Sequence, residues 1–341
     1  MGKKFFVSDC EGPISLNDNA FELSSHFIEY GGEFFKIISR YDDVLADVLK
    51  RQGYNAGGTL KLIIPFLKAY GATNQNIIEF SNKNVNLIPG AHETLKYVSS
   101  KMPSFIVSTS YFHYIKALCN NTGFPIDNTY STKLDMDLMD IKSSERDKIR
   151  EYRTAIVENP EFELLDKIFW KEIPKLEISS LMDSVKPIGG EGKKEVVLDI
   201  ISRHHLKAKD LFYIGDSITD VQPLKFANDN GGIGVSFNGN EYAIKEAEIA
   251  VMADNTTITS VIAEIFNKYG TDNVFEFVLN YKNDPLKALK SRFVNQILAT
   301  KLIKTKLPQI EVVTCNNIDS LIEKSSHFRK KLRGESIGGL G

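Results

Sequence analysis

The sequence predicts an α/β fold built on a doubly wound parallel sheet. Short apolar strands at residues 4–8, 104–108 and 211–214 each lead into a helical segment, and this alternation is typical of parallel sheets. The runs are apolar throughout, as expected of strands that helices cover on both faces. Ligand sites in such sheets lie at the carboxyl ends of the strands, so the residues that follow each run are the candidate site.

The first strand ends in two closely spaced acids. The segment FFVSDCEGP at residues 5–13 carries Asp9 and Glu11, and Gly12-Pro13 then force a turn. Alternation of side chains along an extended backbone places both carboxyl groups on one side of the chain. Neighbouring carboxyl groups push their pKa values apart, so one could act as an ionised nucleophile and the other as a protonated acid. A solvated acidic turn is the competing interpretation.

The third strand leads into a second acidic segment, GDSITD at residues 215–220. Asp216 and Asp220 offer hard oxygen ligands. Magnesium usually takes one or two carboxylates plus substrate phosphate and keeps several waters, so Asp9 with Asp216 is a sufficient protein contribution. A helix N-cap is the alternative role, and it suits Asp220 better than Asp216.

The remaining two segments carry hydroxyls and a lysine. FIVSTSY at 105–111 ends a strand in a serine-rich turn whose hydroxyl and backbone N–H groups could bind an anion. GKKEVVLDII at 192–201 places Lys193 in the first turn of a helix, where its charge opposes the helix dipole and so indicates a nearby anion. An ordinary cap and a solvated lysine are the alternatives.

Together these four segments resemble the four motifs of the haloacid dehalogenase (HAD) superfamily of phosphoryl-transfer enzymes. The stretch GVSFNGNEYAIKEAEIAV at 234–251 is similar to phosphoserine-phosphatase-like members of that superfamily. The resemblance implies a Rossmann-like core, a helical cap inserted after the first strand, a Mg²⁺ cofactor and hydrolysis through an aspartyl-phosphate.

The resemblance also assigns catalytic roles to four residues. Asp9 would be the nucleophile and Glu11 the general acid and base. Ser108 would bind a phosphoryl oxygen, and Lys193 would stabilise charge. These four side chains would therefore carry the reaction.

Metal and substrate binding follow from the same resemblance. Magnesium would contact Asp9, Asp216 and the backbone carbonyl of Glu11, while Asp220 would support its water shell. A small phosphorylated metabolite would be the substrate, with these binding candidates: Asp18, Thr109, Ser110 and Asn238.

The sequence departs from the family pattern at the second acid. The usual first motif is DxDGT, whereas residues 9–13 read DCEGP, so Glu11 adds one methylene and needs a re-set turn. Asp18 matches an acid that recognises the amino acid in phosphoserine phosphatases. The matching arginine is missing, since the corresponding region carries Lys61, and a lysine discriminates less well than a bidentate guanidinium. The carboxylate clamp could therefore be lost or supplied from elsewhere, for instance by Arg40, and phosphoserine is a weaker expectation than phosphatase chemistry in general.

The spacing of the motifs suggests the domain organisation. Residues 1–13 and 86–254 would form the α/β core, with a helical insert at about 135–187. Residues 14–85, apolar at helix spacing, would form the cap, and 255–341 a C-terminal helical extension. The glycine-rich residues 334–341 are expected to fray.

Composition narrows the partners and the compartment. The net charge of −2 gives no basic field, so nucleic acid is not an expected partner. Cys10, Cys119 and Cys315 are widely spaced and odd in number, as in a cytoplasmic protein with reduced thiols, and we expect Cys10 to serve in packing. A strand begins too early for a signal peptide and no apolar run reaches membrane-spanning length, so no membrane insertion is expected.

Three functions follow. The first is a Mg²⁺-dependent phosphomonoesterase. The second is an accessory or regulatory protein on a degenerate phosphatase scaffold, because the chain is also similar to archaeal HAD-type proteins labelled energy-converting hydrogenase A subunit R. A homo-oligomer or a protein partner remains open in both cases. The third, dehalogenase chemistry, needs no magnesium, and the pair Asp216 and Asp220 argues against it.

Overall fold

A seven-stranded sheet forms the centre of the molecule. The computed structural model describes residues 3–340, and the strand order is β3-β2-β1-β4-β5-β6-β7. The first six strands are parallel to their neighbours, and only the last pair, β6 with β7, is antiparallel. The strands are β1 Phe5–Ser8, β2 Ser104–Tyr111, β3 Thr129–Thr132, β4 Leu211–Gly215, β5 Ile233–Phe237, β6 Ile249–Met252 and β7 Gln309–Val312.

The three strands predicted from the sequence are neighbours at the centre of this sheet. Val7 of β1 pairs with Phe105 of β2 on one side and with Tyr213 of β4 on the other. Because all three strands run in the same direction, their carboxyl ends meet at one edge of the sheet. The predicted α/β class with a mainly parallel sheet is confirmed.

Helices cover both faces of the sheet, which explains why the strands are apolar throughout. Phe6, Phe212 and Val235 pack on one face, in a cluster with residues of the helix at 257–269, while Val7 and Tyr213 pack on the other. Alternate residues of one strand thus enter different cores, as the pleat requires. The helices that flank the sheet are α6 Ala91–Ser99, α7 Phe112–Thr122, α11 Glu191–Arg203, α12 Val221–Asp229, α13 Glu241–Glu246 and α14 Thr257–Tyr269.

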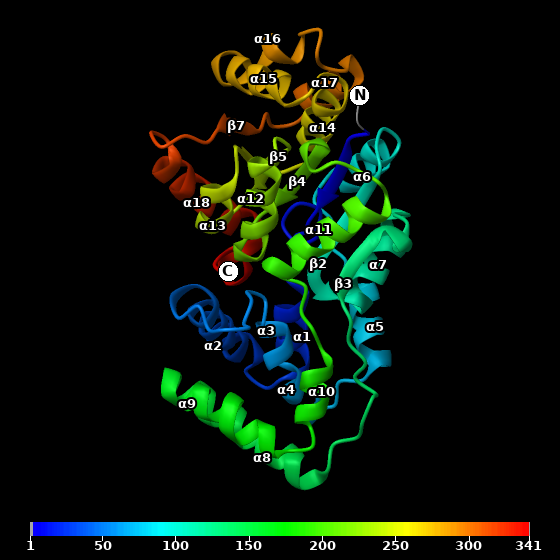
Figure 1. The fold of residues 1–341 in the computed structure, drawn as a ribbon. Coiled ribbons are helices and arrows are strands. Elements are labelled where there is room, and N and C mark those ends of the chain that lie inside the picture. The colour runs from blue at the N-terminus through cyan, green and yellow to red at the C-terminus, as the bar shows by residue number, and fades with distance from the viewer. Residues whose placement is uncertain (1–2, 341) are drawn as a thin grey trace.

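A helical cap lies over the carboxyl edge of the sheet (Figure 1). Residues 14–85 supply α1 Asn19–Phe27, α2 Gly31–Asp43, α3 Thr59–Leu62, α4 Ile64–Ala69 and α5 Asn74–Lys83. The insert supplies α8 Ser143–Glu158, α9 Phe162–Lys167 and α10 Ser179–Ser184.

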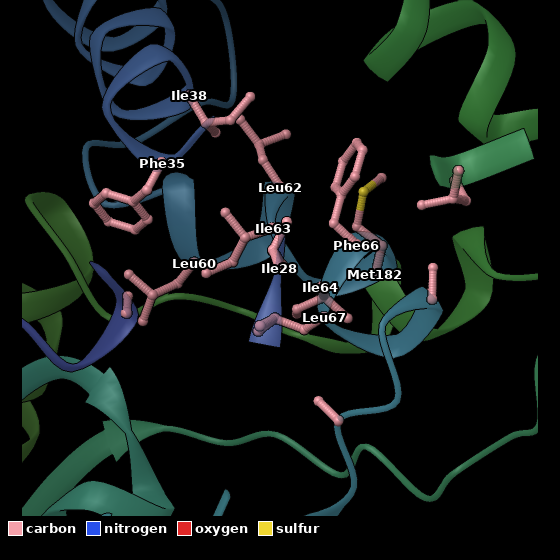
Figure 2. Packing of buried hydrophobic residues seen from close by; sticks show 14 of the residues in the cluster. Ile28, Phe35, Ile38, Leu60, Leu62, Ile63, Ile64, Phe66, Leu67 and Met182 are labelled. Atoms are coloured by element: carbon pink, nitrogen blue, oxygen red, sulfur yellow. The ribbon is translucent and has the colours of Figure 1, made fainter. Parts of the chain in front are cut away.

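The insert packs with the cap in one hydrophobic cluster. Phe66 of α4 and Met182 of α10 belong to this cluster and lie close together in Figure 2. Ile149 and Ile156 give α8 an apolar face that is buried against α4 and α2. The sequence instead groups residues 135–187 with the α/β core, because chain order alone does not show which surface covers this apolar face. The division of the chain into domains stays a prediction.

The C-terminal region differs from the expected helical extension in two ways. It adds a strand, β7, to the sheet, and its α14 packs in the main core beneath the strands. Helices α15 Thr271–Asn283, α16 Pro285–Leu289 and α17 Gln296–Ile303 lie at the end of the molecule opposite the cap (Figure 1).

The last helix, α18 Ile318–Gly338, returns to the carboxyl edge of the sheet. It kinks at Gly334, whose φ of 80° is left-handed, and the chain then folds back. The expectation that residues 334–341 fray is wrong for 334–340, because Leu340 packs against the cap cluster. The end of the described chain therefore lies between the core and the cap (Figure 1), and Gly341 lies outside the described residues.

Two further expectations concern cysteines and membranes. All three cysteines are free, and Cys10 is fully buried in an apolar cluster, which confirms its packing role. Between residues 3 and 340, no helix combines the length and apolar character needed to cross a bilayer.

Candidate active site

The predicted site residues meet in one cavity between the sheet and the cap. Its volume is about 110 Å³, and the cap contributes Asp42, Gly57 and Thr59 to its walls. Seven of the ten residues predicted from the sequence line this cavity: Asp9, Glu11, Asp18, Ser108, Thr109, Ser110 and Asp216. The geometry thus joins residues that lie more than 200 positions apart.

Lys193 bridges two acids beneath the cavity floor. Its Nζ lies 2.7 Å from Oδ2 of Asp9 and 2.7 Å from Oδ1 of Asp220, and the lysine is fully buried. Burial alone would lower the pKa of Lys193, but the two carboxylates raise it above its ordinary value. Lys193 therefore remains charged and neutralises part of the acidic cluster.

Asp9 directly follows β1 and is only 5 % exposed. Its Oδ1 accepts a hydrogen bond of 2.6 Å from the backbone N–H of Cys10. Burial raises the pKa of Asp9 to about 8, although Lys193 opposes this shift. A cation next to Asp9 would favour the ionised form that a nucleophile needs.

Asp220 organises the loop that follows β4. Its Oδ1 accepts hydrogen bonds from Lys193 and from the Tyr213 hydroxyl, both at 2.7 Å, and its Oδ2 accepts from the N–H of Asp216 at 3.0 Å. Burial acts to raise the pKa of Asp220, but Lys193 and these donors hold it below its ordinary value. With its oxygens so engaged, Asp220 is placed to position Asp216 and Lys193.

Asp216 faces the cavity and forms ion pairs with two arginines from the far end of the chain. Its Oδ2 accepts from Nη1 of Arg329 and from Nη1 of Arg333, the latter at 3.2 Å. All three side chains are nearly fully buried. Gly12 packs directly against this carboxylate from the turn after β1.

Glu11 and Asp18 lie on the turn that leads into the cap. Oε1 of Glu11 accepts a hydrogen bond of 2.7 Å from the N–H of Asn19, and Asp18 caps α1 by accepting from the N–H of Phe21 at 2.9 Å. Burial and the nearby Asp18 raise the pKa of Glu11 well above its ordinary value. Burial also raises the pKa of Asp18. A raised pKa favours the protonated form of a carboxyl group, and this form is able to donate a proton.

Hydroxyl groups line the wall contributed by the end of β2. The Ser108 hydroxyl accepts from the N–H of Ser110 at 3.2 Å. The hydroxyls of Thr109 and Ser110 are buried, and neither has a hydrogen-bond partner among residues 3–340. Buried hydroxyls without partners are costly, so a ligand oxygen here would satisfy them.

Asn238, predicted to bind substrate, is not among the cavity-lining residues. Its side-chain amide donates to the carbonyl of Ala253 at 2.8 Å, and its Oδ1 accepts from the N–H of Ala253 at 2.9 Å. Both polar atoms thus join the end of β5 to the end of β6. Asn238 shapes the edge of the sheet, and its predicted substrate contact stays a prediction.

The acidic cluster fits a magnesium ion in its chemistry. Asp9, Asp216 and Asp220 each offer a carboxylate oxygen, and these three atoms lie within 4.8 Å of one another. Such hard, buried oxygens are the ligands that Mg²⁺ prefers. Since Asp220 already accepts several hydrogen bonds, Asp9 and Asp216 are the residues best placed to hold the ion.

The sequence interpretation missed Arg329, Arg333 and the cap residue Asp42. Asp42 accepts from the N–H groups of Gly57 and Thr59 at 3.1 and 3.0 Å and so fixes the cap loop over the cavity. The only sequence signal for the arginines is their spacing of four residues, which places them on one face of a helix.

Comparison with solved structures shows a likeness over the whole chain. Gene product AF1437 from Archaeoglobus fulgidus is similar with a TM-score of 0.85 and 26% sequence identity, over 99% of each chain. The shared fold therefore includes the cap and the C-terminal region.

Two enzymes are more distant likenesses. A phosphoserine phosphatase in its apo form has a TM-score of 0.46 and 15% identity, over 79% of this chain and 100% of that chain. A HAD family hydrolase from Salmonella enterica serovar Typhi has a TM-score of 0.46 and 12% identity, over 71% and 65%. No protein-family model and no curated protein matches the chain.

Proposed function

We propose that the protein is a magnesium-dependent phosphatase that hydrolyses a small phosphorylated metabolite through an aspartyl-phosphate on Asp9. One observation carries the proposal. The buried carboxylates Asp9 and Asp216 share a single cavity with the Ser108 hydroxyl, and Lys193 contacts Asp9 at 2.7 Å. This combination supplies a nucleophile, a metal ligand, an anion contact and a fixed positive charge.

The first half-reaction would use Asp9 and Glu11. A carboxylate oxygen of Asp9 bonds to phosphorus as the bond from phosphorus to the leaving oxygen breaks, and Glu11 donates a proton to that oxygen. In the second half-reaction the ionised Glu11 takes a proton from a water that attacks phosphorus and releases Asp9. Ser108 and Lys193 would hold and neutralise the phosphoryl group in both steps.

Magnesium held by Asp9 and Asp216 would offset the negative charge of the phosphoryl oxygens. Two features of the chain position these carboxylates. Asp220 orients Asp216 through the N–H bond at 3.0 Å, and Gly12 allows the turn to approach the carboxylate. Because the turn at Gly12 and the loop at Asp216 are in close contact, a shift in one would disturb the other.

The cavity favours a small substrate. Its volume of about 110 Å³ is below the range of roughly 300–1,000 Å³ typical of pockets that bind drug-sized molecules. Gly57 and Thr59 of a cap loop and Leu340 near the end of the chain line it as well. A small phosphorylated metabolite suits this space, and the free thiols suit a reducing compartment such as the cytoplasm.

One observation favours a second function, that of an accessory protein with little or no turnover. Arg329 and Arg333 already form ion pairs with Asp216, so this carboxylate has positive partners without a metal. The protein could then bind a phosphorylated ligand or serve a protein partner, such as a hydrogenase complex, or another copy of itself.

A metal-dependent phosphatase screen tests the proposal. The protein is assayed across phosphorylated metabolites with and without Mg²⁺, beside Asp9→Asn and the exposed control Asp140→Asn. We expect Mg²⁺-dependent release of phosphate that Asp9→Asn abolishes and Asp140→Asn retains. Phosphate release that persists in Asp9→Asn would exclude Asp9 as nucleophile, and no release from any ester would favour the accessory function.

A further inference from the structure

The C-terminal helix α18 inserts two arginines into the candidate site. Leu321, Ser325, Arg329 and Arg333 recur every four residues and so lie along one face of the helix. The Ser325 hydroxyl anchors this face by donating to the carbonyl of Gly239 at 2.6 Å. The face therefore points at the loops that follow β4 and β5.

Arg333 is held in place mainly by backbone groups. Its Nε donates to the carbonyl of Leu16 at 3.0 Å, and its Nη2 donates to the carbonyl of Asn17. These carbonyls belong to the turn that carries Asp18. Arg333 is thus a positioning residue that ties α18 to the entrance of the cap.

Arg329 is held differently. Its guanidinium is 4 % exposed and depends on Asp216 for its close contact, which Nη1 makes to Oδ2. The other contacts of Nη1 and Nη2 to backbone carbonyls are long, at 3.3–3.5 Å, and its Nε is buried with no hydrogen-bond partner among residues 3–340. Arg329 lines the cavity, and its Nε is a donor that the described residues do not use.

A divalent cation on Asp216 would compete with Arg329. Both groups require the same buried carboxylate, and a buried charge deprived of its partner is strongly unfavourable. A guanidinium released from Asp216 needs a new anion nearby. Its planar fork matches the oxygens of a phosphoryl or carboxyl group.

We propose that Arg329 is an anion-binding residue that exchanges partners, holding Asp216 in the empty site and the anionic group of the substrate once the cation takes Asp216. This inference rests on the proposed function, because it places the cation at Asp216. It follows that cation and anion bind cooperatively, each strengthening the other by the same factor.

Calorimetry of the full-length protein tests this exchange. Mg²⁺ is titrated alone and in the presence of inorganic phosphate, into the wild type, Arg329→Gln and the matched control Lys330→Gln. Lys330 is the next residue along α18, and its side chain is 46% exposed. Without its competitor, Asp216 in Arg329→Gln should bind Mg²⁺ alone about 5-fold or more tightly than in the wild type.

Arg329→Gln should also change how strongly phosphate affects Mg²⁺ binding. In the wild type and in Lys330→Gln, phosphate should tighten Mg²⁺ binding by a factor within about 5–150, the usual range of coupling between two sites. In Arg329→Gln this enhancement should fall several-fold. If Arg329→Gln unfolds, Arg329→Lys keeps the charge and should lose the enhancement without tightening Mg²⁺ binding.

The outcomes separate this inference from the proposed function. Magnesium binding that Asp216→Asn abolishes but Arg329→Gln leaves unchanged, with the phosphate effect intact, would overturn the inference alone. Magnesium binding that is undetectable in the wild type, or that Asp216→Asn does not weaken, would overturn both.

Discussion

Gly12 and Asp216 pack so closely that no side chain fits between them. A Cβ on Gly12 would lie 2.1 Å from Oδ2 of Asp216, and the φ of Gly12 is +97°. The backbone of the turn after β1 therefore packs directly against the Asp216 side chain of the loop after β4. Glycine here serves both a left-handed conformation and a close approach.

Gly12→Ala should destabilise the protein by about 1–3 kcal/mol, because the added methyl group must displace the buried Asp216 carboxylate. Urea unfolding measures this loss, and calorimetry should show weaker Mg²⁺ binding. Gly53→Ala is the control, since φ there is also positive (+75°) but nothing lies within 4 Å. Equal losses in the two variants would show that backbone strain alone explains the effect.

Lys193→Met should lower the free energy of unfolding by about 3–5 kcal/mol, because Asp9 and Asp220 would then share a buried space without their cation. The neighbouring Lys194→Met should change it by no more than about 0.5 kcal/mol, since Lys194 is partly exposed and forms an ion pair with Glu191 on the same helix. Adding Asp220→Asn to Lys193→Met should recover part of the loss. A double variant no more stable than Lys193→Met would contradict the charge explanation.

Glu11→Gln should lower turnover by roughly 10²–10⁴-fold while leaving Mg²⁺ affinity nearly unchanged, because its proposed metal contact is the backbone carbonyl. Glu11→Asp should retain activity or raise it. Steady-state kinetics beside calorimetry separate the two effects. Turnover in Glu11→Gln equal to that of the wild type would contradict the acid–base role of Glu11. Activity that appears only in Glu11→Asp would show that the native protein has lost its catalytic activity.

Gly189→Ala should loosen the cap. A Cβ at Gly189 would lie 2.2 Å from the carbonyl oxygen of Ala56, so the loop that closes the cavity must move. We expect a loss of about 1–3 kcal/mol in urea unfolding and faster proteolysis within residues 50–58. Gly192→Ala, whose Cβ would meet no atom closer than 3.7 Å, should instead gain about 0.4–1 kcal/mol. Unchanged proteolysis in Gly189→Ala would show that the loop accommodates the methyl group.

Asp43→Asn should remove a pH-dependent loss of stability. Burial raises the pKa of Asp43 to about 7, and Asp42 and Asp47 add to this shift. A carboxyl group whose pKa is higher in the folded state stabilises it when protonated, so its contribution falls as pH rises from about 4 to about 7. Above that window the free energy of unfolding of Asp43→Asn should exceed that of the wild type by about 1–2 kcal/mol. Urea unfolding across this range is the measurement, with the exposed Glu33→Gln on the same helix as control. A wild-type advantage at high pH would refute the expected sign.

Much of the site was predictable because local rules place it. Apolar runs predict β1, β2 and β4, and the residues after them must lie at the carboxyl edge of a parallel sheet. Asp9, Ser108 and Asp216 therefore came together as expected once their strands proved to be neighbours. Asn238 also follows a strand, but its side chain hydrogen-bonds to the backbone of Ala253. The position of Asn238 after a strand does not by itself predict this partner.

The sequence by itself determined the three central strands, the helical character of the cap and the order of the acids, serine and lysine along the chain, since these depend on periodicity and chain direction. Only the tertiary structure decided that the second insert packs into the cap and that Arg329 and Arg333 reach Asp216 from more than a hundred residues away. The reason is physical: an amphipathic helix shows which of its faces is buried, but its partner is decided by long-range contacts such as that of Ser325 with Gly239.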